Sequence, residues 1–279
     1  MLFGGHCGGG IKSSIDRAVE IGADAVQLFA QSPRAWRYPD HDPADLEAFR
    51  LRREEAGLGG AFIHALYLLN LASEKADFYE KSTTTLRQTA ETASAIAADG
   101  VCFHTGSHLG GGLDGSLDRI AAALEPALEA CSGPTWLLIE NTAGSGGTIG
   151  RSVDELATIV DRLGRHPRLG LCLDSCHLYA SGYDVTDRDE LDRLVEEIDS
   201  KIGLDRLRLL HINDSKAPLA SNRDRHDGVL AGLMGEQLGV FVGYPALQGL
   251  PAVIETGAAS RGPDASDITA LRELHARWT

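Results

Sequence analysis

The stretch TWLLIEN, residues 135–141, decides how this chain folds. It is a short apolar run that stops on a carboxylate, Glu140, followed by an amide. Continuous apolar runs of about four to eight residues are typical of strands that are buried on both faces. A carboxylate at the end of such a strand is costly to bury unless charged or hydrogen-bonding groups surround it. We therefore expect Glu140 to have a function.

Five more apolar runs end in the same way, each on a histidine, an aspartate or a glutamate. They are FIH (62–64), VCFH (101–104), LCLD (171–174), LLH (209–211) and VIE (253–255). The six terminal residues stand at positions 64, 104, 140, 174, 211 and 255, so the gaps between them are 40, 36, 34, 37 and 44 residues. Each gap is as long as one strand followed by one helix.

Eight strand-like runs can be marked in total, at 2–7, 24–30, 60–65, 100–106, 135–141, 169–177, 206–214 and 251–256. Eight strand-plus-helix units in 279 residues fit a (β/α)8 barrel, which typically takes about 250 residues. A doubly wound sheet is the alternative, but it rarely holds eight regular repeats with polar groups at most strand ends. No linker or composition shift marks a second domain. We predict a single α/β domain over residues 1–279, a TIM barrel.

Helices are expected between these runs, at 12–21, 44–56, 74–98, 117–130, 189–201 and 265–278, and with less definition within 234–242. Asp99-Gly100 is a stop signal for the third of them. Ser152 begins another helix, and Glu155 three residues later predicts a capping box. After the seventh strand we expect a long polar loop that extends to about residue 227.

The bulk composition is that of an ordinary globular protein, with 43% hydrophobic and 24% charged residues. No apolar run approaches the roughly 18 residues that a membrane span needs, and the N-terminus lacks the pattern of a signal peptide. We predict a cytoplasmic protein with no membrane association. The net charge of −14 argues against nonspecific coating of nucleic acid, but it allows a site charged by metal ions.

Five cysteines are an odd number, and no Cys-x-x-Cys pair occurs among them. A disulfide framework or a zinc ribbon is therefore not expected. Cys102 and Cys172 lie inside apolar runs, where small buried thiols are common. We interpret them as core residues.

In a parallel barrel every strand delivers its last residue to the same face, so the six strand-end residues converge on one pocket. His177 follows Asp174 by three residues, and an Asp-x-His pair lies in the loop after the seventh strand. The nine candidate metal ligands are His64, His104, Glu140, Asp174, His177, His211, Asp224, His226 and Glu255.

Carboxylates crowded into one pocket repel each other, and divalent cations relieve that repulsion. Mixed histidine and carboxylate ligands suit zinc or manganese better than magnesium or calcium. At about three to four protein ligands per ion, nine ligands predict two or three metal ions. One carboxylate would then bridge two of them.

Several runs together resemble the endonuclease IV family of apurinic/apyrimidinic endonucleases. They are SPRAW (32–36), HALYLLN (64–70), FHTGSHLG (103–110), IENTAG (139–144), LDSCHLYASGYD (173–184), HINDSK (211–216) and DRH (224–226). The resemblance spans nearly the whole chain. It implies a TIM barrel with three metal ions, mostly zinc. It also implies hydrolysis of the phosphodiester 5′ to abasic sites in duplex DNA during base excision repair, leaving a 3′-hydroxyl, with trimming of blocked 3′ ends.

The resemblance also assigns roles to the nine candidates. It places the first metal on His64, His104 and Glu140, the second on Glu140, Asp174, His211 and Glu255, and the third on His177, Asp224 and His226. Glu140 and Glu255 would be the catalytic residues. Glu140 would bridge two ions, and Glu255 would orient the nucleophile or take its proton. Asn141 would support this geometry from behind the ligands.

The resemblance implies that Arg34 and Tyr67 contact DNA, and Lys216 and Arg225 flank the third set of ligands, where they could pair with phosphates. For Lys216 and Arg225, a solvated charged loop is the equally weighted alternative, while Trp36 is expected to pack beneath its own loop. The partner implied is duplex DNA that contains abasic sites, and we expect the protein to act as a monomer.

The chain departs from the family pattern at three places. The segment after His226 reads GVLAGLMGEQLG, with Leu230 and Ala231 in place of part of a glycine-rich run; Gly257 follows Thr256 where proline is usual; and GGHCGGG lacks a serine. These changes put substrate preference in doubt more than metal binding. One alternative function is a metal-dependent sugar isomerase or epimerase on the same barrel, although the third ligand set has no role there. A lesion-binding relative that does not cleave is the other.

Overall fold

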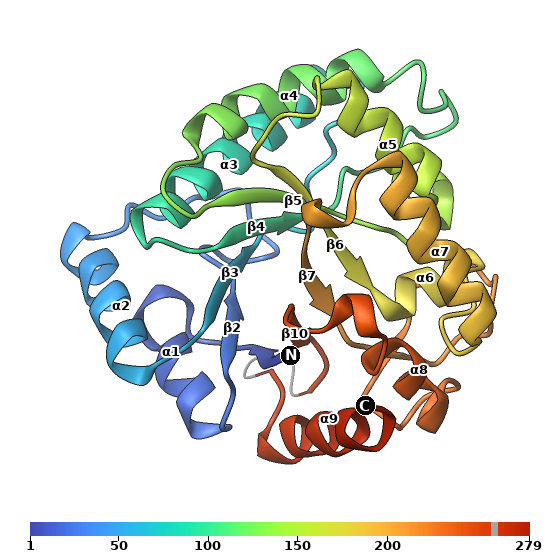
Figure 1. The fold of residues 1–279 in the computed structure, drawn as a ribbon. Coiled ribbons are helices and arrows are strands. Elements are labelled where there is room, and N and C mark those ends of the chain that lie inside the picture. Colours follow the sequence, from blue (N-terminus) through green and yellow to red (C-terminus); the bar gives the residue numbers. More distant parts are fainter. Residues whose placement is uncertain (258–261) are drawn as a thin grey trace.

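Eight parallel strands close into a barrel around which the helices are arranged (Figure 1). The computed structural model describes residues 1–257 and 262–279. Consecutive strands are neighbours, and β1 closes the barrel against β10. The predicted TIM barrel is therefore confirmed. The barrel strands are β1 Leu2–His6, β2 Ala25–Leu28, β3 Gly60–His64, β4 Gly100–Phe103, β5 Trp136–Glu140, β6 Leu169–Asp174, β7 Leu207–His211 and β10 Pro251–Ile254.

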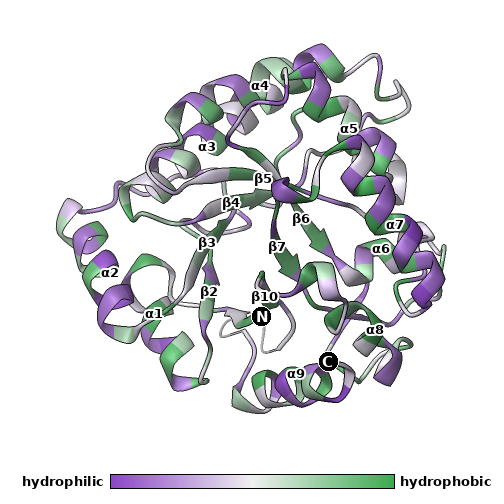
Figure 2. Cartoon of the chain, viewed as in Figure 1, coloured by the Kyte–Doolittle hydropathy of each residue, from purple (hydrophilic) through white to green (hydrophobic). Residues whose placement is uncertain are grey.

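Seven longer helices form the outer ring (Figure 1): α1 Gly10–Glu20, α2 Pro43–Ala56, α3 Ala76–Ala95, α4 Leu117–Ala130, α5 Val153–Arg162, α7 Arg188–Lys201 and α9 Ala265–Trp278. Shorter helical segments are α6 Ser175–Ser181, α8 Gly239–Val242, η1 Ser145–Gly147, η2 Leu204–Arg206, η3 Gly235–Leu238 and η4 Pro245–Leu247. The helices mix apolar and polar residues around the mostly apolar strands (Figure 2). Among the described helices, none has the length and apolarity that crossing a membrane requires.

The barrel interior holds a small apolar cluster of its own, separate from the large core between strands and helices. Its members are Phe62, Cys102, Leu138, Cys172, Leu209 and Val253. Each stands two residues before one of the six strand-end polar residues identified in the sequence. Because side chains alternate across a strand, residues two apart point the same way. The cluster therefore fills the barrel interior directly below the polar residues at the strand ends.

The third helix ends earlier than predicted. α3 stops at Ala95, and the backbone turns through Ala97, whose φ is +53°. Asp99 does not act as a helix stop; its Oδ2 accepts hydrogen bonds from Arg53 Nη2 at 2.7 Å and from the Ala61 amide at 2.8 Å. The carboxylate therefore joins α2 and β3 to the start of β4, a contact between distant parts of the chain.

The capping box predicted at α5 is only half correct. Ser152 Oγ accepts a hydrogen bond from the Glu155 amide at 3.3 Å, as an N-cap residue should. The Glu155 carboxylate does not return to Ser152. Its Oε2 accepts from the amides of Gly150 at 2.8 Å and Arg151 at 3.2 Å, so it fastens the preceding loop instead.

Two elements that position ligands were not predicted. The sixth strand ends at Asp174, and residues 175–177 begin α6 where strand was expected. Asp174 caps α6 by accepting from the His177 amide at 2.7 Å. The expected long loop after β7 contains an antiparallel hairpin of β8 Asp214–Ser215 and β9 His226–Asp227, which pairs His226 with Ser215. The helix expected within 234–242 consists of η3 and α8.

The five free cysteines are all buried, so they should be inert in the folded protein. Burial raises the pKa of Cys7, Cys131 and Cys176 to about 12. Because only the thiolate reacts, an aromatic disulfide reagent at about pH 8 is expected to modify no cysteine of the native protein. Five thiols should react after unfolding in guanidinium chloride. A thiol that reacts in the native protein as fast as free cysteine would contradict the burial seen here.

Candidate metal centre

The structure brings the nine candidate ligands together at the carboxyl ends of the barrel strands. In three groups, ligand atoms from every member lie within 4.8 Å of one another. These groups are His64, His104 and Glu140; Glu140, Asp174, His211 and Glu255; and Asp174, His177 and His226. The first two have the composition that the family resemblance implies. In the third, Asp174 takes the place expected for Asp224.

Asp224 nevertheless belongs to the third group by its contacts. One carboxylate oxygen, Oδ2, lies 3.4 Å from His177 Nε2, and the other, Oδ1, lies 3.3 Å from His226 Nε2. Burial favours the neutral acid, but His177 and His226 outweigh it and lower the pKa of Asp224 to about 2. The carboxylate is therefore ionised, as a metal ligand must be.

Glu140 is the member that joins the first two groups. Its side chain is fully buried, with Oε2 3.2 Å from His64 Nε2 and 3.5 Å from His104 Nε2. Its Oε1 lies 2.9 Å from His211 Nδ1 and 3.3 Å from His177 Nδ1. Burial alone would raise the pKa of Glu140, but the surrounding imidazoles lower it well below its usual value. Glu140 is therefore ionised, and both of its oxygens are available as ligands of a cation.

Two histidines have one ring nitrogen committed to the protein and the other facing carboxylates. His64 Nδ1 lies 2.8 Å from the Ala65 carbonyl oxygen, which can only accept, so Nδ1 carries the proton. His211 Nε2 lies in the same way 2.9 Å from Gln27 Oε1. The remaining nitrogen of each ring faces Glu140, and it directs a lone pair there once it has lost its proton. Lone pairs and carboxylate oxygens that converge in this way fit a cation between them.

The third group shows the same arrangement. His177 Nδ1 lies 3.0 Å from the Asn141 carbonyl oxygen, which leaves its Nε2 facing His226 Nε2 at 3.2 Å. Asp174 Oδ2 lies 3.6 Å from the same nitrogen of His226. Several of these facing atoms can only accept hydrogen bonds, so they cannot all be partners of one another. A divalent ion between the two imidazole nitrogens and the carboxylates would satisfy them together.

Three amide side chains hold the acidic residues in place, and two of them, Gln27 and Asn213, were not singled out from the sequence. Asn213 Nδ2 donates to Asp174 Oδ2 at 2.6 Å and to Glu255 Oε2 at 3.2 Å. Asn141, expected to support the site, exchanges hydrogen bonds with the backbone of Asp174 at 2.7 and 3.3 Å. Gln27 Nε2 donates to Glu255 Oε1 at 2.8 Å. The signal that was available for Gln27 is an amide in the middle of the apolar run DAVQLFA.

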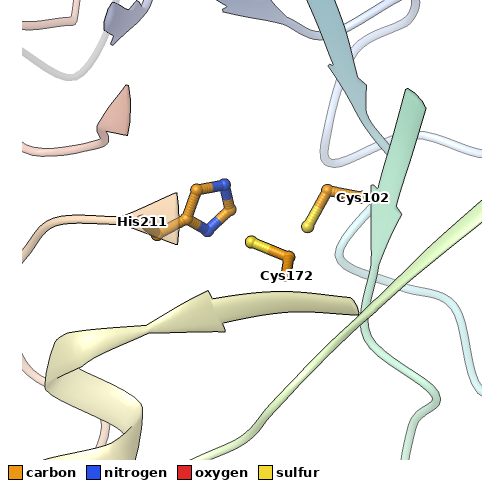
Figure 3. A group of neighbouring side chains, drawn as sticks. All are labelled: Cys102, Cys172 and His211. Atoms are coloured by element: carbon orange, nitrogen blue, oxygen red, sulfur yellow. The ribbon is translucent and has the colours of Figure 1, made fainter. Parts of the chain in front are cut away.

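Two thiols of the barrel interior lie directly beneath the ligands. The sulfur of Cys102 is directed toward Cys172, and the sulfur of Cys172 is directed toward His211 (Figure 3). Cys102 Sγ donates to Glu140 Oε2 at 3.3 Å. The interpretation of these cysteines as core residues agrees with their membership of the interior apolar cluster. Cys102 additionally touches the carboxylate that joins the first two groups.

Two cavities flank the ligands, and Tyr67 lines both. The larger, of about 650 Å³, lies on the Glu255 side and is lined by His6, the glycines of residues 8–10 and Arg34. The smaller, of about 400 Å³, lies over His104, His177 and Asp224. An extended substrate could therefore lie across the metal-ligating residues and contact both cavities.

The side chains implied to contact DNA fall into two sets. Arg34 and Tyr67 line the larger cavity, and Tyr67 is 56% exposed. Trp36, expected to pack beneath its own loop, packs edge-on against Phe78 of α3, with ring centroids 5.9 Å apart. Lys216 is exposed beside the third group, where its Nζ donates to the His226 carbonyl at 3.1 Å.

Arg225 is also exposed and bonds within its own loop, to the Asp224 carbonyl at 2.5 Å.

The segment after His226, which departs from the family pattern, is held in place by Asp214. The buried carboxylate of Asp214 accepts from the amides of Gly232, Met234 and Gly235 at 2.9–3.0 Å. Leu230 adopts a φ of +68°, a conformation that favours glycine. Leu230 thus adopts the backbone conformation of a turn at a position where the family pattern is rich in glycine.

Comparison with known proteins shows the family to which this chain belongs. The family described as the xylose isomerase-like TIM barrel matches residues 15–248. A protein of Methanoculleus marisnigri, named probable endonuclease 4, is 37% identical over 278 residues, which are 98% of this chain and 99% of the relative. The solved structure of endonuclease IV from Thermus thermophilus has a TM-score of 0.85 and 34% identity, and covers 100% of this chain and 98% of its own.

A D-tagatose 3-epimerase-like protein also superposes, with a TM-score of 0.73 over 100% of this chain and 97% of its own. Its 17% identity shows a shared barrel fold alone. The two endonucleases match at twice that identity over nearly their whole lengths. The chain belongs to the endonuclease IV family of xylose isomerase-like TIM barrels.

Proposed function

We propose that this protein is a metal-dependent endonuclease of base excision repair that hydrolyses the phosphodiester 5′ to abasic sites in duplex DNA and leaves a 3′-hydroxyl. The observation that carries the proposal is the third ligand group, His177, Asp224 and His226, beside the two groups joined by Glu140. A sugar isomerase or epimerase on the same barrel needs one or two ions and has no use for a third set.

The three groups would hold three divalent ions, zinc in most or all positions and manganese in one or more as the alternative. When bound, such ions neutralise the charge of the phosphodiester and lower the pKa of a water molecule, as metal-assisted hydrolysis requires. The residues themselves fit this role because ionised carboxylates and imidazole nitrogens converge in each group. Because the net charge is −14, bound cations would also offset the repulsion between the protein and a phosphate at this place.

In this proposal Glu255 is the carboxylate that acts on the attacking water. It lines the larger cavity, and its two oxygens are held by Gln27 and Asn213. Burial favours the neutral acid, but the charge of the neighbouring imidazoles, that of His211 first, lowers the pKa of Glu255 well below its usual value. An ionised carboxylate in a fixed position accepts a hydrogen bond from the water and can take its proton.

DNA is expected to lie across both cavities, with the abasic nucleotide turned out of the helix. Extrusion costs least where a base is already missing, which gives selectivity for the lesion. Tyr67 stands between the two cavities, and Arg34 lines the larger one. Lys216 and Arg225 are placed to pair with phosphates near the third group. These contacts make affinity for duplex DNA fall as the salt concentration rises.

The decisive experiment is incubation of the purified protein with a duplex that carries one tetrahydrofuran abasic analogue, with and without a chelator, while bound metals are counted. We expect a single incision 5′ to the analogue, lost with the chelator, and no incision of the same duplex without the lesion. Absence of incision together with one metal per chain would favour the isomerase alternative. Tight lesion binding without incision would favour the relative that does not cleave.

Metal binding should also compete with protons at the histidines. Burial opposes the charged form of His177, but the carboxylates of Asp174, Asp224 and Glu140 raise its pKa well above its usual value. In the metal-free protein this protonation stabilises the fold below about pH 6.5, and the contribution is lost as pH rises through the folded-state pKa. A metal needs the deprotonated imidazole, so its affinity rises over the same range.

The difference in melting temperature between the metal-loaded and the chelated protein is therefore expected to increase from about pH 6 to pH 8. Thermal unfolding at several pH values, with the chelator as the only variable, measures it. A difference that stays constant or shrinks toward pH 8 would show that protons do not occupy the metal positions.

A further inference from the structure

Polar atoms without partners gather on the walls of the larger cavity. Of the buried side-chain atoms that lack a hydrogen-bond partner among the described residues, three belong to residues that line it: His6 Nε2, Gln31 Oε1 and His41 Nε2. Buried polar atoms in native proteins nearly always have a partner. Three such atoms around one cavity of about 650 Å³ indicate that a polar ligand completes them.

The orientation of the Gln27 amide decides where the proton of His6 lies. Gln27 Oε1 accepts from His211 Nε2 at 2.9 Å, and Gln27 Nε2 donates to Glu255 Oε1 at 2.8 Å. An ionised carboxylate only accepts, so the amide nitrogen must be on the Glu255 side. The same nitrogen faces His6 Nδ1 at 3.0 Å. His6 Nδ1 is therefore the acceptor, and the neutral ring carries its hydrogen on Nε2.

The ring of His6 is also held in place by packing. His6 is the last residue of β1, and its ring lies against Phe29 with centroids 4.3 Å apart. The residue is only 9% exposed, so the ring has little room to turn. Its Nε2–H is thus an oriented, desolvated donor beside Glu255, the carboxylate that we place on the attacking water.

The charges of the same cavity indicate what the donor binds. Arg34 lines the cavity and forms no ion pair with any residue in the described part of the chain. Lys12 lines it as well, but its Nζ lies 2.9 Å from the carboxylate of Asp45, another lining residue, so this cation is already paired. A cavity lined by an arginine that has no ion-pair partner among the described residues, and by a buried N–H donor, suits an oxygen acceptor on an anionic ligand.

We propose that His6 Nε2 donates a hydrogen bond to an oxygen of the sugar-phosphate unit at the scissile bond, and that Gln27 holds His6 in the donor tautomer. The inference rests on the proposed function and adds a substrate contact to it. His6 then acts on the substrate directly, whereas Gln27 is a positioning residue that sets His6, His211 and Glu255 at once.

Two substitutions of His6 separate the donor from the rest of the ring. In His6→Gln the side-chain amide can reach the position of Nε2 and donate there. In His6→Asn the shorter amide can occupy only the position of Nδ1, so the contact with Gln27 is possible but the donor is lost. With the duplex bearing a tetrahydrofuran site, we expect kcat/KM to fall about 10- to 100-fold in His6→Asn and to stay within about fivefold of the wild type in His6→Gln.

Metal content and melting temperature decide between a substrate contact and a structural role. Both variants are expected to keep the metal count and melting temperature of the wild-type protein. Loss of metal or of stability in His6→Asn, or equal activity of the two variants, overturns the proposal. Failure of the wild-type protein to incise the duplex would instead be a failure of the proposed function.

Competition distinguishes the two possible acceptors. Inorganic phosphate and 2-deoxyribose are tested separately as inhibitors of the wild-type protein and of His6→Asn. A weaker effect of phosphate on the variant assigns the contact to a phosphate oxygen, and a weaker effect of the sugar assigns it to a sugar oxygen. Unchanged inhibition by both contradicts the proposed contact.

Discussion

Glu140→Gln is expected to abolish incision of abasic DNA, with a loss of roughly 10⁴-fold or more in kcat. The carboxylate belongs to two ligand groups, and each of its oxygens faces two imidazoles. An amide of the same shape removes the charge and places an NH2 group where a lone pair is required. At least two metal positions should therefore lose affinity together.

The measurement combines single-turnover incision with a metal count on the same preparation. Glu129→Gln is the matched control, because it makes the same chemical change at an exposed position of α4. The control should keep both the metals and the activity. A Glu140→Gln protein that retains the full metal complement and cleaves at the native rate would contradict the bridging role of Glu140.

Glu255→Gln is expected to separate catalysis from metal binding, with a loss of about 10³-fold in kcat while most of the metal is retained. Three other side chains of its group remain, so the ions still have ligands. Both oxygens of Glu255 now accept, from Gln27 and Asn213. The new amide can satisfy only one of these donors, and it cannot take a proton from water.

The test is the rate of incision under single-turnover conditions across pH, with bound metals counted. If Glu255 takes the proton, the remaining activity should rise with the concentration of hydroxide. Retained metal with wild-type turnover would exclude Glu255 from the reaction. Loss of all metal would instead identify it as a ligand whose contribution to catalysis cannot be separated from binding.

Much of this site could be predicted from the sequence because it follows from the alternation of side chains along each barrel strand. Inside a parallel barrel the side chains of each strand alternate, so an apolar residue that fills the interior is followed two positions later by a residue at the mouth. Leu138 and Glu140 form such a pair, as do Leu209 and His211. The short apolar runs that end on an acid or a histidine therefore indicate both the barrel and the ligand ring.

The local elements that refine the site were less predictable. Residues 175–177 continue an apparent strand pattern, yet they begin α6 because Asp174 caps them. The hairpin that carries His226 depends on pairing across ten residues of loop, which no periodicity announces. Glu155 has the spacing of a capping box, but its carboxylate accepts hydrogen bonds from the loop amides of Gly150 and Arg151 instead of the Ser152 amide.

The sequence by itself determined the eightfold repeat and which residues stand at the strand ends, since both follow from local alternation and from spacing along the chain. Only the tertiary structure decided which ring nitrogen of each histidine is free and that His6 offers a donor to the larger cavity. Gln27 shows the reason. Its amide meets His6, His211 and Glu255, from three other strands or strand ends, and hydrogen bonds of that kind depend on distances that no linear pattern contains.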